Sequence, residues 1–113
     1  MVQNRNKLIE LFVGNISNSI VHDILERSVS KELMAYKYRK ELITSLEVAK
    51  RYREKINPTN TPLPLRDIAY MRTKIINKVK TELMTRILKG YKNIDLSLID
   101  DLVDKALKDV NIT

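Results

Sequence analysis

Chain breakers are rare in this sequence, and that rarity most restricts how it can fold. Its prolines all lie between positions 58 and 64, and its only glycines are Gly14 and Gly90. From Lys31 to Ile56 neither residue type occurs, which predicts one helix about 39 Å long at ~1.5 Å per residue. Its apolar and small residues recur at helical spacing. They form one face, made of Ala35, Tyr38, Leu42, Leu46, Ala49, Tyr52 and Ile56.

A second long helix is predicted over residues 65–89, with Gly90 as its C-terminal stop. Its buried face consists of Ile68, Met71, Ile75, Val79, Leu83 and Ile87. Between the two helices, residues 57–64 are expected to be an extended, proline-rich connector. Two long helices joined by a short connector pack most simply as an antiparallel hairpin. We therefore expect helices 31–56 and 65–89 to form the scaffold.

Shorter helices are predicted at both ends of the chain. Residues 1–30 read as two short helices, the first stopped by Gly14 and the second capped by Ser17 or Asn18. Residues 95–110 read as an acidic C-terminal helix that Asp95 caps, packed either on its own chain or on a partner. The expected fold is all-α: one helical domain over 1–113, a bundle of four to five helices.

The composition excludes several protein classes. Apolar residues make up 43% of the chain and charged residues 31%, which is too hydrophobic for a disordered protein. No apolar run approaches the ~20 residues of a membrane helix, and no secretory signal is recognised. Cysteine is absent, so disulfides and thiolate metal sites are excluded. We expect a soluble, cytoplasmic protein with no membrane partner.

Positive charge is concentrated in the middle of the chain. Positions 31–92 carry sixteen basic and six acidic side chains, whereas positions 93–113 carry two basic and five acidic ones. Such a surface suits the phosphate backbone of DNA or RNA, because neutralising phosphates releases counterions without reading bases. The predicted phosphate-binding residues are Lys50, Arg51, Arg53, Lys55, Lys74, Lys78, Lys89 and Lys92. The alternative is that these side chains only coat a solvated helix face.

A second function class is open, namely a structural or interaction subunit that docks on another protein or on a second copy of itself. The acidic amphipathic C-terminal helix favours it, because such a helix can lie in a partner's groove. Sequence-specific DNA readout is not expected, because the chain has no helix-turn-helix with a glycine turn, no zinc-ligand spacing and no basic region followed by heptads.

No catalytic site is predicted. The only histidine, His22, has no nucleophile or metal ligand in a recognisable constellation with it, and it reads as a surface or core-edge residue. Asp100, Asp101 and Asp104 are explained by their place near the positive end of a helix. Glycine-rich phosphate loops and nucleophile motifs are absent. We therefore expect no enzyme activity, no catalytic residue, no cofactor and no bound metal.

The stretch from Arg72 to Tyr91 places basic side chains beside an apolar ridge. Its characteristic residues are Ile75, Ile76, Val79, Leu83, Arg86, Ile87 and Lys89. In this it resembles the last long helix of the helical domain of GINS subunits, accessory proteins of the replicative helicase. The stretch covers about a fifth of the chain, and the family's N-terminal leucine-proline-aromatic segment and small β domain have no counterpart here. The resemblance implies a helical subunit that binds neighbouring subunits and the DNA machinery.

Overall fold

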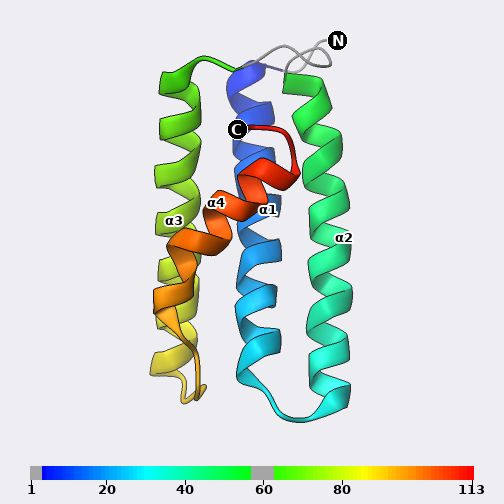
Figure 1. Ribbon diagram of the computed structural model, residues 1–113, viewed down its shortest axis with the longest axis vertical. Helices are drawn as coiled ribbons and strands as arrows, with labels where there is room; N and C mark the ends of the chain where they lie inside the picture. Colours follow the sequence, from blue (N-terminus) through cyan, green and yellow to red (C-terminus); the bar gives the residue numbers. More distant parts are fainter. Residues whose placement is uncertain (1–3, 57–62) are drawn as a thin grey trace.

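One long N-terminal helix lies at the centre of the computed structural model, which describes residues 4–56 and 63–113 (Figure 1). The elements in chain order are α1 (Arg5–Ser28), α2 (Glu32–Ile56), α3 (Leu65–Leu88), the 3-10 helix η1 (Leu96–Leu98) and α4 (Ile99–Asp109). α2 and α3 lie on either side of α1, and α4 crosses α1 obliquely on one face (Figure 1). No strand occurs among the described residues, so the predicted all-α bundle is confirmed.

α1 is a single helix of 24 residues, and the prediction of two short helices in residues 1–30 is therefore wrong. Gly14 lies inside the helix instead of ending it. Buried side chains continue across it at helical spacing, through Phe12, Ile16 and Ile20. A glycine inside a helix costs about 1 kcal/mol relative to alanine, whereas each buried large apolar side chain contributes about 1.5–3 kcal/mol. Packing therefore outweighs the local stop signal.

A long antiparallel hairpin is present, but α1 and α2 form it, and the predicted pairing of helices 31–56 and 65–89 is wrong. α2 and α3 have almost no contact with each other, and α1 and α3 run in the same direction (Figure 1). The reason is the burial of α1, which has eleven buried residues against four on each of its neighbours. A helix that is apolar around most of its circumference belongs at the centre of a bundle.

The ends of α3 agree with the sequence. Leu65 is its first residue and Leu88 its last, while Gly90 adopts a left-handed φ of 101°. The Tyr91 amide donates to the Arg86 carbonyl at 3.1 Å, a bond that closes helices ending in such a glycine. The predicted helix over 65–89 is confirmed, although Ile87 is exposed. The predicted connector over 57–64 lies mostly outside the described residues.

α4 packs on α1 and α3 of its own chain, the first of the two placements left open by the sequence. Its buried side chains are Ile99, Val103 and Leu107. Asp95 accepts a hydrogen bond from the Ser97 amide, so the predicted cap is present, at the start of η1. Arg72 of α3 donates from Nε to Oδ1 of Asp104 at 2.7 Å. An acidic helix therefore lies against a basic one.

Acid is expected to weaken this packing of α4. The Arg72 guanidinium lowers the pKa of Asp104, as a hydrogen-bonded cation favours the ionised carboxylate. A carboxyl whose pKa is lower in the folded state stabilises the fold above its unfolded pKa of about 3.9 and loses that contribution as pH falls through the folded pKa. When the pH is lowered from about 7 to about 3, the Tm of Asp104→Asn should therefore fall by less than the Tm of wild type. Circular dichroism melts measure this small difference, and equal losses would contradict it.

Candidate nucleic-acid interface

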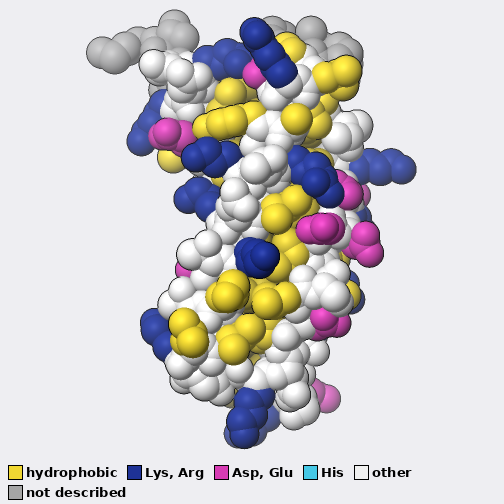
Figure 2. All heavy atoms as spheres, turned by 90° about the vertical axis from the view of Figure 1, so that its left-hand side faces the viewer, with side chains coloured by type: hydrophobic (Ala, Val, Ile, Leu, Met, Phe, Trp, Pro, Cys, Tyr) yellow, Lys and Arg dark blue, Asp and Glu magenta, His cyan; other side chains and the backbone are white. Residues whose placement is uncertain are grey.

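Seven of the eight predicted phosphate-binding residues are exposed. They are Lys50, Arg51 and Lys55 on α2, Lys74 and Lys78 on α3, and Lys89 and Lys92 in the segment that follows α3. The two helices flank α1, so the structure does not gather these residues into one patch. Figure 2, which looks onto the α3 side, shows basic side chains at intervals along the molecule, with acidic ones mostly toward the α4 side. The candidate interface therefore consists of two separate rows.

Arg53 is the exception, because its side chain is buried and only 9% of the residue is exposed. Its Nε and Nη2 both donate to the carbonyl oxygen of Asn111, at 3.2 and 3.0 Å. Asn111 follows α4 and has a left-handed φ of 60°. Arg53 thus ties the end of α4 to α2. It has a structural role and does not belong to the surface that phosphate binding requires.

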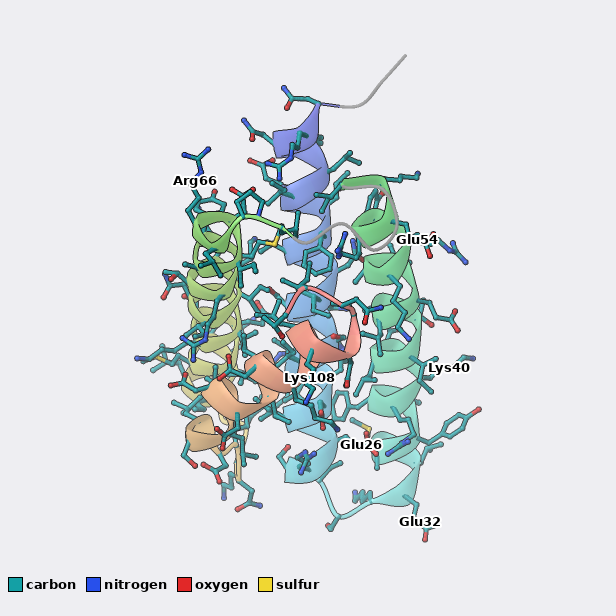
Figure 3. All side chains as sticks on the ribbon, turned by 45° about the horizontal axis from the view of Figure 1, so that its top comes forward. Glu26, Glu32, Lys40, Glu54, Arg66 and Lys108 are labelled. Carbon is teal, nitrogen blue, oxygen red and sulfur yellow. The ribbon has the colours of Figure 1, made fainter. Side chains whose placement is uncertain are left out.

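In the part of the chain that the structure describes, the ion pairs are formed by arginines and not by lysines. Within the described ranges these pairs are Arg5–Asp67, Arg27–Asp23, Arg39–Glu26, Arg72–Asp104 and Arg86–Glu82. No lysine of the described chain lies within 4.0 Å of a carboxylate oxygen. Figure 3 shows one of them, Lys40 of α2, pointing away from the bundle. The lysine charge therefore remains available to an external anion.

Lys74 and Lys78 border a surface groove between α1 and α3, here named the α1/α3 groove. It consists of two adjoining hollows of about 260 and about 460 Å³, both lined by these two lysines. The smaller hollow is also lined by Ile9, Glu10, Val13 and Tyr70. The larger is also lined by Gly14, Ser17, Asn18, Val21, Asn77, Thr81 and Glu82. Both volumes are close to the ~300–1,000 Å³ of small-ligand sites.

Charges of both signs line the groove. Glu82 lies 3.5 Å from Nη2 of Arg86, which offsets its charge, while Glu10 has no such partner among the described residues. The ammonium of Lys74 lies 5.8 Å from the centre of the Tyr70 ring, a distance typical of cation–π contact. Tyr70 is itself 51% exposed, so its ring is accessible beside a lysine. Amide and hydroxyl groups supply neutral hydrogen-bonding partners.

Two residues that line this groove, Gly14 and Ser17, had been predicted to stop and to cap a helix. A Cβ added to Gly14 would meet no atom within 4 Å, so crowding does not require the glycine. Ser17 is only 5% exposed, and its Oγ is buried without a hydrogen-bond partner in the described part of the chain. A glycine in a helix costs about 1 kcal/mol and an unsatisfied buried hydroxyl about 1–3 kcal/mol. α1 thus carries two destabilising features on one hollow.

The other predicted cap, Asn18, instead donates from Nδ2 to Oγ of Ser45 on α2 at 2.6 Å. His22 donates from Nδ1 to the Asn18 carbonyl at 2.8 Å, and its ring lies 5.9 Å from that of Tyr38. These contacts make His22 a core-edge residue, as expected. Within the described residues, no three histidine or acidic side chains lie close enough together to hold a metal ion.

Comparisons with protein-family models, with curated proteins and with solved structures find no match to this chain. The likeness to GINS subunits therefore remains a resemblance over a single helix, α3. None of the described helices combines the length and the apolar character that crossing a bilayer requires.

Proposed function

We propose that this protein is a non-catalytic nucleic-acid-binding subunit that contacts the phosphate backbone through the lysines of α3. The observation that carries the proposal is that the arginines and the lysines of this chain make different contacts. All five ion pairs of the described residues use an arginine, and three of them join different helices, whereas the lysines stand free at the surface. Free lysines neutralise phosphates and release counterions without discriminating between bases.

The α3 row is the stronger of the two candidate surfaces. Lys74 and Lys78 are one helical turn apart on the α1/α3 groove, and Lys89 lies three turns further on. Tyr70 adds an exposed ring beside Lys74, and aromatic rings of this kind stack on unpaired bases. On α2, Lys50, Arg51 and Lys55 are exposed but do not line the α1/α3 groove, so they serve as secondary contacts.

Fluorescence anisotropy with labelled single-stranded DNA, duplex DNA and RNA tests the proposal. Phosphate neutralisation predicts binding at low salt whose logarithmic affinity falls linearly with the logarithm of salt, by about 0.7 per single-strand contact and about 0.9 per duplex contact. A slope of about −2 or steeper is expected if three or more lysines take part. Absence of binding to all three probes at low salt would refute the proposal.

A second candidate function, docking of a partner protein, is favoured by an exposed apolar face at the C-terminal end of α3. Met84, Ile87 and Leu88 are 46%, 39% and 88% exposed, and Figure 2 shows hydrophobic side chains gathered in the lower half of this side. Lys80 and Lys89 are close in sequence to this face and are exposed. A second copy would bring lysines against lysines, so an acidic amphipathic helix is the better complement.

This second function predicts that an acidic amphipathic helical peptide binds wild type more tightly than it binds Met84→Gln/Leu88→Gln. Both residues are exposed, so the double variant should remain folded. Removing two apolar anchors should weaken binding about tenfold or more, since each contributes about 1 kcal/mol. Calorimetry with the peptide and with a scrambled control measures it. Equal affinity of both proteins would exclude this face.

A further inference from the structure

The larger hollow of the α1/α3 groove combines free positive charge with two features that lower the stability of α1. Gly14 and Ser17 are three residues apart and so lie on one face of the helix. Both line the hollow that Lys74 and Lys78 border from α3. Local rules of sequence design are broken most often at functional sites. Two violations at one hollow, next to two free lysines, therefore point to a ligand.

We infer that this hollow binds a phosphate group, carried by single-stranded nucleic acid or by a free nucleotide. Lys74 and Lys78 supply the charge, and the phosphate enters beside Gly14. The Ser17 hydroxyl is covered in the unliganded protein, so its side chain rotates toward the hollow to donate to a phosphate oxygen. The inference rests on the proposed function and adds its binding site and ligand class. It also accounts for the Ser17 hydroxyl, which has no partner among the described residues.

The lining of the hollow offers a phosphate group both positive charge and several hydrogen-bond donors. Lysine ammonium groups and a serine hydroxyl are hydrogen-bond donors, and the hydroxyl of Thr81 and the amide of Asn77 add two more. Lysine is a regular phosphate ligand that acts as a point charge. Glu82 also lines the hollow, and its position beside Arg86 leaves the balance on the lysine side.

The size of the hollow favours a single strand over a duplex. Its volume of about 460 Å³ lies within the range of sites for small ligands. A phosphate on a flexible single strand can enter such a hollow, whereas the phosphates of a duplex are fixed on the outside of a rigid rod. Duplex DNA is therefore expected to contact only lysine ammonium groups at the protein surface and not the inside of the hollow. The hollow should contribute to the affinity for single strands alone.

Gly14→Leu and Gly14→Ala provide a matched test. Both replace glycine by a good helix former, and a Cβ at this position has free space, so both should fold. Only leucine has a side chain long enough to extend from position 14 into the hollow. With a labelled single-stranded thymidine oligonucleotide, the alanine variant should bind within about twofold of wild type and the leucine variant about tenfold more weakly. Affinity for duplex DNA should be the same in all three proteins.

Ser17→Ala gives a second, independent readout. Removing an unsatisfied buried hydroxyl should raise Tm, since the desolvated group no longer needs a partner. The same change should weaken single-strand binding by about threefold to tenfold, because the phosphate loses a donor. Opposite signs of the two effects distinguish a ligand-binding residue from a structural one. A variant that is more stable and binds as tightly as wild type would overturn the inference.

The outcomes separate this inference from the proposed function. If wild type binds the oligonucleotide and Gly14→Leu binds it equally well, the groove is not the site, while lysine-mediated binding stands. If wild type binds no nucleic acid at low salt, both proposals fail. Competition by adenosine monophosphate that Gly14→Leu abolishes identifies the ligand as a free nucleotide. Groove-dependent oligonucleotide binding without such competition identifies it as the phosphodiester of a strand.

Discussion

Replacing Lys74, Lys78 and Lys89 together with glutamate is expected to weaken single-strand binding about 100-fold at about 0.1 M salt while leaving the protein folded. The three side chains are exposed and form no ion pair with any described residue, so their charge does not support the bundle. Each single-strand phosphate contact contributes about 0.7 to the salt slope, and three lost contacts amount to about two decades of affinity at this salt. Anisotropy at several salt concentrations measures both the loss and the shallower slope.

The control for this variant is a second triple variant, in which three lysines outside the α3 row are replaced by glutamate. Lys31 immediately precedes α2, and Lys37 and Lys40 lie in its first half. All three are exposed, and Figure 3 shows Lys40 pointing away from the bundle. Their replacement by glutamate alters only the long-range field, which salt screens over about 10 Å at 0.1 M. We expect less than a tenfold loss, by the arithmetic of ~1.4 kcal/mol per decade. Equal losses in both triple variants would mean that net charge, and not the α3 row, determines binding.

Phe12→Ala is expected to lower the free energy of unfolding by about 3–5 kcal/mol, the range for truncating a buried phenylalanine. Phe12 lies on α1, is fully buried, and belongs to the single core that α1 shares with α2, α3 and α4. Loss of this side chain leaves a cavity at the centre of the bundle. Urea unfolding monitored by circular dichroism measures the change, with an unaltered m value as the sign that the native fold persists.

Leu46→Ala is the matched control on α2, where the side chain is only half-buried. It removes fewer contacts and should cost less than half as much as Phe12→Ala, in proportion to the area that the leucine buries. If α2 and α3 formed the scaffold, truncating a residue on the apolar face of α2 would instead lower the free energy of unfolding as much as truncating one on α1. Equal costs of the two substitutions would therefore contradict the central position of α1.

Local signals in the sequence were sufficient to predict three of the four helices. The run without glycine or proline before Ile56, the stop at Gly90 and the cap at Asp95 each act over a few residues, and the structure shows all three. The prediction that Gly14 ends a helix was wrong. Glycine disfavours the inside of a helix, but the burial of α1 against α2, α3 and α4 outweighs this preference. The pairing of the hairpin failed with it, since a continuous α1 displaces α3 from α2.

The candidate site was predictable in its charges but not in its shape. Periodicity places Lys74 and Lys78 away from the apolar stripe of α3, and both are exposed. The same reasoning failed for Arg53, because its carbonyl partner, Asn111, lies 58 residues away along the chain. Ser17 became interpretable only once α1 was seen to be continuous, which places it opposite two lysines of another helix. Contacts between distant segments of a chain leave little trace in local sequence patterns.

The most direct test of the α1/α3 groove as the nucleic-acid site is a two-dimensional ¹H–¹⁵N spectrum of the 13.2 kDa protein, titrated with a single-stranded oligonucleotide. Binding in the groove predicts that the largest amide shifts occur at Gly14, Ser17 and Asn18 on α1 and around Lys74 and Lys78 on α3. Smaller shifts are expected at Lys50 to Lys55. Shifts confined to α2, or spread evenly over all lysines with none on α1, would contradict it.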